Sequence, residues 1–232
     1  MCTIALATRV FDAVPIALGA NREERYDRPA VAPARMETDP VIYGPMDMAA
    51  GGTWIAINEN GVVVAVTNRE GGPPGTKSRG WLVRDTVHFT DAKSATRAAT
   101  RALKSGAYTG CNLLVVDPET AIVLTWDGDL ERRTLPPGIH VIVNEGINGD
   151  VAKSATLRAR LETMELDSVD AWEARLLAIL RDHGIGACVH GPEAGTRSSS
   201  MVSRTATGEV RWRYADGPPC ETQYRPWRKS EL

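Results

Sequence analysis

Two runs of apolar and β-branched residues open the chain and predict a pair of strands. They cover residues 2–8 and 15–21. The first run begins with Cys2, and the second is followed directly by the charged cluster Arg22-Glu23-Glu24. A charge run by itself is more often a solvated turn. Here, antiparallel pairing of the two strands would bring the cluster close to Cys2, so we expect it to contribute to a site.

Further strand patterns follow along the rest of the chain. Residues 53–58 and 62–68 flank Glu59-Asn60-Gly61, and Asn-Gly is the strongest short signal for a hairpin. The other predicted strands are separated by turns that contain Asp, Pro or Gly, and they cover residues 112–116, 121–126, 130–134, 139–144, 198–204 and 209–215.

Two blocks between the predicted strands have helical periodicity. Residues 79–104 form the first block, with a break and cap at Thr90 or Asp91 and a stop at Gly106. Residues 151–181 form the second block, in which Ser168 is a candidate cap and apolar residues recur at helical spacing: Leu157, Leu161 and Met164, then Val169, Trp172 and Leu176. This order of strands and helices is the one that an αββα sandwich needs, and it also suits other α+β folds.

Length and composition predict one cytoplasmic domain that spans residues 1–232. The net charge of −2 and the pI near 6.1 argue against a nucleic-acid surface built on bulk charge. The N-terminus lacks the pattern of a signal peptide, and no apolar run approaches the roughly 18–20 residues of a membrane span. The four cysteines, at positions 2, 111, 188 and 220, form no closely spaced pair, which is typical of a reducing compartment.

Cys2 directly follows Met1, so removal of Met1 would place a nucleophile and a base on one residue. A thiol attacks as the thiolate, and an α-amine with an ordinary pKa of about 7.7–8.0 can accept its proton near neutral pH. The alternative is that position 2 merely tolerates a small residue.

Short motifs along most of the chain resemble, in order, those of the NRDE proteins, which are also called the transport and Golgi organisation family. These motifs are Met1-Cys2-Thr3, Ala20-Asn21-Arg22-Glu23-Glu24, Arg28-Pro29, Gly44-Pro45-Met46-Asp47, Ala50-Gly51-Gly52-Thr53-Trp54, Thr67-Asn68, Ser78-Arg79-Gly80, Val143-Asn144 and Gly195-Thr196-Arg197-Ser198-Ser199. One position departs from the family pattern, because Glu23 stands where the family has Asp. The longer carboxylate can do the same electrostatic work only if its strand retreats by about one methylene.

The resemblance implies an αββα sandwich of two stacked antiparallel sheets flanked by helices, the fold of the N-terminal nucleophile (Ntn) hydrolases. It also implies roles for five residues. Cys2 would be the nucleophile, and Glu23 would orient its amine. Asn68 and Asn144 would build the oxyanion site, and Arg197 would sit beside the sulfur. Arg204, on the same predicted strand, is the alternative to Arg197.

The function expected from this resemblance is hydrolysis of an amide C–N bond in a small molecule, without a cofactor or a metal. The alternative is a protein that binds or traffics haem or another amphipathic ligand on the same fold, since eukaryotic members of the family are associated with haem handling. A third possibility is a degenerate hydrolase without activity. Removal of Met1 separates the first two, because a blocked amine disables hydrolysis but need not disturb a carrier.

Two other motifs could indicate a different function, namely phosphate binding or metal binding. Residues 71–78 imitate a phosphate-binding loop, but Thr76 stands where the second glycine must be and two prolines remove amide donors. His183, Cys188 and His190 lie close together in sequence and could bind a metal or haem iron. Without a fourth partner or a recognised spacing, this segment is interpreted as a loop with ordinary polar residues.

Overall fold

The computed structural model describes residues 2–36, 38–162 and 168–227. They form two compact units, which we name by their place in the chain. The terminal unit combines residues 1–27 and 137–231, and the central unit comprises residues 28–136. Each unit contains one antiparallel sheet and one pair of helices, so the prediction of an α+β chain with two antiparallel sheets and flanking helices is confirmed. No helix among the described residues is both long and apolar enough to cross a membrane.

The sheet of the terminal unit interleaves strands from both ends of the chain. Its order is β10-β1-β2-β11-β12-β13, and the bounds are β1 Thr3–Phe11, β2 Val14–Arg25, β10 Gly138–Val143, β11 Ala194–Arg204, β12 Val210–Ala215 and β13 Arg225–Trp227. The predicted pairing of the first two strands is confirmed, with Thr3 opposite Asn21. Since β1 lies between β2 and β10, the strand that follows Cys2 is an interior strand of the sheet.

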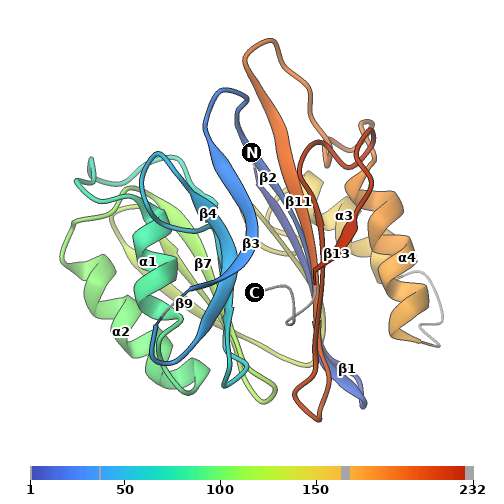
Figure 1. Cartoon of the computed structure of the whole chain (residues 1–232). Coiled ribbons are helices and arrows are strands. Elements are labelled where there is room, and N and C mark those ends of the chain that lie inside the picture. Colours follow the sequence, from blue (N-terminus) through green and yellow to red (C-terminus); the bar gives the residue numbers. More distant parts are fainter. Residues whose placement is uncertain (1, 37, 163–167, 228–232) are drawn as a thin grey trace. The chain divides into compact units, whose positions relative to one another are not determined.

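Helices α3 (Ala152–Glu162) and α4 (Val169–Leu180) cover one face of this sheet (Figure 1). The predicted cap is confirmed, because the Ser168 side chain accepts a hydrogen bond from the Ala171 N–H. The helical spacing is confirmed by full burial of one residue in every turn that faces the sheet, namely Leu157, Leu161, Trp172 and Leu176. Of the other two residues of that pattern, Val169 is partly buried against the same core, and Met164 lies outside the described residues. Gly19 lets α4 approach β2, because a Cβ there would overlap Leu176.

The sheet of the central unit is a meander in which every strand pairs with its sequence neighbours. It consists of β3 Ala30–Met36, β4 Ile42–Asp47, β5 Ile55–Asn58, β6 Val63–Asn68, β7 Cys111–Val116, β8 Ala121–Trp126 and β9 Leu130–Leu135. The predicted hairpin joins β5 to β6, and Gly61 adopts a φ of +89° in the turn, a conformation that glycine reaches without strain.

Helices α1 (Arg79–Thr86) and α2 (Ala92–Lys104) connect β6 to β7 and pack on the central sheet (Figure 1). Of the two candidate caps, Asp91 is the one used, since its side chain accepts a hydrogen bond from the Ser94 N–H. The chain leaves α2 through Gly106, with a φ of +74°, where the stop was predicted.

Strands β3 and β4 escaped the sequence analysis because prolines interrupt both of them. Pro33 coincides with a register shift between Val31 and Ala34, and β3 is an edge strand, where a missing N–H is tolerated. In β4, pairing with β5 covers Ile42 and Tyr43 and ends before Pro45.

Candidate functional site

Three neighbouring strands bring Cys2 together with two of the predicted site residues. Cys2 directly precedes β1, and Thr3 pairs with Asn21 of β2 on one side and Val143 of β10 on the other. This register places Arg22 and Glu23 on one side of Cys2 and Asn144 on the other. The Cys2 backbone N–H donates a hydrogen bond to Asn144 Oδ1 at 2.8 Å, so this contact joins residues that are 142 positions apart.

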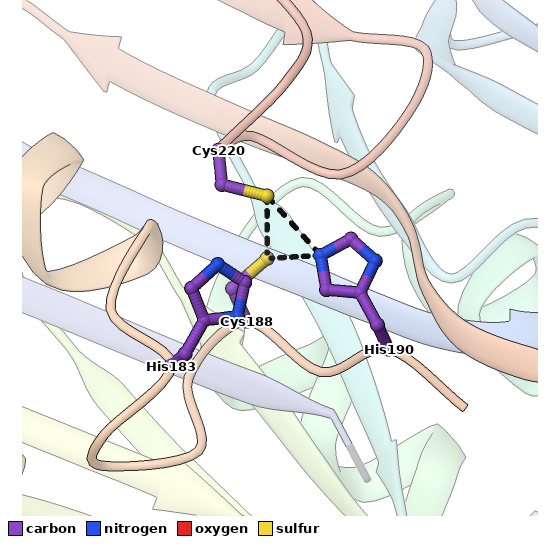
Figure 2. Close-up of side chains that lie close together, drawn as sticks. All are labelled: His183, Cys188, His190 and Cys220. Atoms are coloured by element: carbon purple, nitrogen blue, oxygen red, sulfur yellow. Dashed lines mark hydrogen bonds between the residues drawn. The ribbon is translucent and has the colours of Figure 1, made fainter.

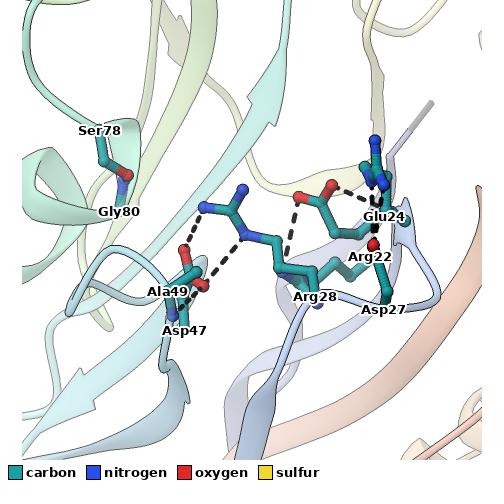
Figure 3. Close-up of polar contacts among 9 residues, drawn as sticks. Arg22, Glu24, Asp27, Arg28, Asp47, Ala49, Ser78 and Gly80 are labelled. Atoms are coloured by element: carbon teal, nitrogen blue, oxygen red, sulfur yellow. Dashed lines mark hydrogen bonds and ion pairs between the residues drawn. The ribbon is translucent and has the colours of Figure 1, made fainter.

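The charged cluster after residue 21 is not a solvated turn. Strand β2 continues to Arg25, and within it Arg22 is 6% exposed and Glu23 is 9% exposed. The alternative that these charges form an exposed turn is therefore wrong for Arg22 and Glu23. Glu24 is more accessible and forms an ion pair with Arg22 at 3.5 Å (Figure 3).

Cys2 and Glu23 each have an unusual pKa in this environment. Burial raises the pKa of the Cys2 thiol to about 11, and the neighbouring charge of Glu23 contributes in the same direction. Burial likewise raises the pKa of Glu23 from 4.5 to about 7, although the positive charge of Lys153 on α3 opposes the shift. A thiol and a carboxylate that titrate so far from their usual ranges are typical of functional sites.

Arg22 is a site residue to which the sequence analysis assigned no separate role. Its positive charge acts on the Cys2 thiol and lowers the thiol pKa, in opposition to burial. The predicted pairing of the first two strands could have identified it. Asn21 of β2 pairs with Thr3, and Arg22 is the next residue of β2, so it lies beside Cys2.

Arg197, the residue proposed to sit beside the sulfur, lies at a bulge in β11 between Thr196, which pairs with Glu23, and Ser198, which pairs with Arg22. Its guanidinium bonds to the Asp216 carboxylate at 2.9 Å. Arg204, the alternative, lies at the far end of β11 and donates to the Thr205 carbonyl. Of these two, Arg197 is the one next to the strand segment that carries Glu23.

Asn68 belongs to the central unit. It is the last residue of β6, it pairs in register with Cys111, and its side chain is exposed, unlike the rest of that strand.

Asn21 is a further residue that the sequence analysis left without a role. It is 1% exposed, and its Nδ2 donates to the carbonyls of Leu180 at 2.8 Å and Ala187 at 2.7 Å. Its Oδ1 accepts a hydrogen bond from Ser199 at 2.6 Å. Asn21 therefore connects β2, beside the site, to the end of α4 and to the loop that follows.

Several motifs that suggested the family resemblance have a structural role within the central unit. Arg28 donates two hydrogen bonds to the Asp47 carboxylate, at 3.0 and 2.6 Å, and this pair joins two motifs that are 19 positions apart (Figure 3). Gly52 packs directly on Gly80 at the start of α1, where a Cβ would overlap the Gly80 backbone.

The structure also brings together four side chains of the types that bind metals. They come from the loop after α4 and from the segment between β12 and β13, and they are His183, Cys188, His190 and Cys220 (Figure 2). The sequence analysis named the first three and lacked the fourth.

Comparison with known proteins places these features in a family. The model of the family described as Transport and Golgi organisation 2 matches residues 1–204. The Transport and Golgi organization 2 homologue of Mus musculus is 30% identical over 238 residues, and the match covers 86% of this chain and 85% of the mouse protein. The Bos taurus homologue is 28% identical, with the same coverage of both chains.

Solved structures with low sequence identity share the fold. One is the Caenorhabditis elegans N-acylethanolamine-hydrolyzing acid amidase orthologue, with a TM-score of 0.55 and 14% identity, over 86% of this chain and 92% of that chain. Another is the R18L variant of a conjugated bile acid hydrolase from Clostridium perfringens, with a TM-score of 0.51 and 12% identity, over 98% of this chain and 97% of that chain. Both similarities extend over the terminal and central units, so the Ntn-hydrolase fold class is confirmed. The chain belongs to the Transport and Golgi organisation 2 family and has the fold of the Ntn hydrolases.

Proposed function

We propose that the protein is an N-terminal-cysteine amidohydrolase that cleaves the C–N bond of a small amide. The observation that carries this proposal is the convergence of Cys2, Glu23 and Asn144 at the end of three adjacent strands, with the Cys2 nitrogen 2.8 Å from Asn144 Oδ1. The amidase and the bile acid hydrolase that share the fold have names that describe amide hydrolysis, which is consistent with this chemistry.

The proposed reaction begins with removal of Met1, which converts the Cys2 backbone nitrogen into a free α-amine. This amine takes the thiol proton, and Sγ attacks the substrate carbonyl carbon. The resulting tetrahedral intermediate collapses, the C–N bond breaks, and the ammonium returns its proton to the leaving amine. Water then hydrolyses the thioester, which releases the carboxylic acid and regenerates the thiol.

The surrounding residues have separate roles in this scheme. Glu23 holds the α-ammonium, and its negative charge favours the protonated amine that must form in the transition state. Asn144 donates to the oxyanion, and loss of one such donor typically lowers the rate by about 10²–10³. Arg22 stabilises the thiolate, while Arg197 is the candidate for an acidic group of the substrate.

The test is to incubate the protein with a panel of N-acyl amides that includes N-acylethanolamines and bile-acid conjugates, and to follow release of the amine. Intact mass should show a chain that lacks one methionine and, in a rapidly quenched reaction, an acyl adduct on Cys2. Cys2→Ala should abolish turnover, and Cys2→Ser should reduce it steeply, because a hydroxyl is a far weaker nucleophile at this pH. Cys111→Ala removes a thiol outside the site and serves as the control.

The carrier alternative predicts a different pattern in the same experiments. No amide would turn over, and haem would titrate the wild type and Cys2→Ala identically, to saturation and without a product. Retention of Met1 in active protein would eliminate the proposed base and overturn the mechanism.

A further inference from the structure

The four side chains in Figure 2 form a compact set of two thiols and two imidazoles. The ligand atoms of His183, Cys188, His190 and Cys220 all lie within 4.8 Å of one another. Both cysteines are free thiols. We propose that these four residues bind one zinc-type divalent metal ion in a tetrahedral site made of two cysteines and two histidines.

The three distances that join the ligand atoms of Cys188, His190 and Cys220 are close to the edges of such a site. Zinc bonds of about 2.3 Å to sulfur and about 2.0–2.1 Å to nitrogen place tetrahedral ligand atoms roughly 3.3–3.8 Å apart. The two sulfurs, of Cys188 and Cys220, are 3.5 Å apart. His190 Nε2 lies 3.2 Å from the Cys220 sulfur and 3.8 Å from the Cys188 sulfur.

His183 is the fourth residue of the set. Its ring centroid lies 5.1 Å from that of His190, and the two planes are tilted by 36°, so the rings converge without stacking face to face (Figure 2). Two thiolates and two neutral imidazoles form a ligand set that favours zinc over calcium or magnesium, which prefer oxygen.

The loop that carries His183 and Cys188 is held in place by its own hydrogen bonds. Asp182 caps it, because the N–H groups of Ala187 and Cys188 both donate to the Asp182 carbonyl at 3.1 Å, while the Asp182 carboxylate accepts from the Ile185 N–H. Arg160 of α3 fixes the same carboxylate at 2.6 Å. The backbone that carries these two ligands is therefore held in place.

The other two ligands are fixed by separate parts of the terminal unit. His190 forms an antiparallel bridge with Gly195 at the start of β11. Cys220 lies in a turn in which the Thr222 N–H donates to the Pro218 carbonyl, and Arg181, at the end of α4, donates to the Pro219 carbonyl at 2.9 Å. A metal ion would thus join two segments, the loop between α4 and β11 and the segment between β12 and β13.

Four protein ligands leave no open coordination position, which is typical of a structural site. The metal would stabilise the loop after α4, and that loop contacts β2 through the bond from Asn21 to the Ala187 carbonyl. We therefore expect the metal to increase stability and to act on the Cys2 site only through the position of β2.

The direct test is metal analysis of the purified full-length chain after expression with added Zn²⁺, together with Co²⁺ titration of chelator-treated protein under reducing conditions. We expect about one zinc per chain. Co²⁺ should give the visible ligand-field bands of tetrahedral coordination and a sulfur-to-cobalt charge-transfer band. Chelation should lower Tm, and Zn²⁺ should restore it, because an ion that binds the folded chain stabilises it.

Variants identify the ligands. Cys220→Ser and His190→Gln should each weaken zinc binding at least about tenfold, and Cys188→Ser/Cys220→Ser should abolish the charge-transfer band. Cys2→Ala and His88→Gln, which lie outside the cluster, should retain the metal, so this proposal and the hydrolase proposal can fail independently. Substoichiometric zinc with no tetrahedral Co²⁺ spectrum in reduced wild type would overturn the proposal, and so would full zinc binding by the double cysteine variant.

Discussion

At the residue scale, the shared environment of Cys2 and Glu23 raises the pKa of both side chains. Burial disfavours both anions and raises the pKa of Glu23 to about 7, and the negative charge of Glu23 adds to the effect of burial on Cys2, whose pKa rises to about 11. A thiol with that pKa is almost entirely protonated at neutral pH. A positive N-terminal charge lowers the pKa of both groups, and a free α-ammonium on Cys2 itself would place that charge next to the thiol, so we expect removal of Met1 to activate the thiol.

Alkylation of Cys2 measures this activation. With an N-terminal extension in place, the reaction with iodoacetamide at pH 7 should be slow and should rise with pH towards about 11. After site-specific cleavage that leaves Cys2 first, the rate at pH 7 should increase at least about tenfold, because the thiolate fraction grows. Peptide mass spectrometry gives both rates. Cys111 serves as an unreactive reference, because it is buried and burial raises its pKa to about 12. Equal rates before and after cleavage would contradict the expectation.

The raised pKa of Glu23 also makes stability depend on pH. Between pH 4.5 and about 7 the folded chain with Met1 in place binds more protons at this site than the unfolded chain, so the free energy of unfolding falls as pH rises through that interval. The loss is up to about 3 kcal/mol, since a tenfold difference in proton affinity between the folded and unfolded chain corresponds to about 1.4 kcal/mol. Glu23→Gln cannot titrate and should lack this component of the slope. Urea unfolding at pH 4 to 8 tests it, and parallel curves for the two proteins would refute the assignment.

At the element scale, β2 is both a strand of the site and an anchor for α4. Its buried Asn21 supplies two donors to carbonyls at the end of α4 and in the following loop, and the neighbouring residues Arg22 and Glu23 act at Cys2. The geometry of the site therefore depends on how β2 is held, as well as on the site residues themselves.

Asn21→Leu tests this dependence, because leucine has a similar size but cannot donate. The Leu180 and Ala187 carbonyls would lose a buried partner, at a cost of about 1–3 kcal/mol each. Urea unfolding should show a decrease of this order, and Cys2 alkylation should change its pH dependence as β2 shifts. An unchanged midpoint would show that water replaces the amide.

The cap of α2 allows a cleaner test of a single element. Asp91 accepts hydrogen bonds from the N–H and the hydroxyl of Ser94, and α2 packs on the central sheet. Asp91→Ala should cost about 1 kcal/mol of unfolding free energy, whereas Asp91→Asn retains an acceptor and should cost much less. If both variants unfold at the same denaturant concentration, the cap has no measurable role.

At the scale of the whole molecule, the two units differ in how the chain builds them. Every strand pair of the central sheet joins sequence neighbours, while in the terminal sheet β1 and β2 from the N-terminus separate β10 from β11. The central unit can therefore form its pairs locally, and the terminal unit must close loops of more than 100 residues.

Expression of the two fragments tests this difference. Residues 28–136 retain all seven strands of their sheet and both of its helices, so this fragment should show a β-rich circular dichroism spectrum and a cooperative thermal transition. Residues 137–231 lack β1 and β2 and should remain largely unfolded until a peptide of residues 1–27 is added. Cooperative folding of the second fragment alone would contradict this expectation.

The sequence by itself determined the features that depend on near neighbours. The alternation of apolar and polar residues and the helical spacing of apolar residues predicted most strands and all four helices of the described part of the chain. Short-range hydrogen bonding made the roles of Asp91, Ser168 and Gly106 predictable. Adjacency in a hairpin was enough to place Glu23 near Cys2. Tertiary structure alone decided the burial of Arg22, the bonds of Asn21 and the meeting of Cys220 with His183, Cys188 and His190. These features arise where strands or loops far apart in sequence come together, and no local pattern records which distant residue a side chain will meet.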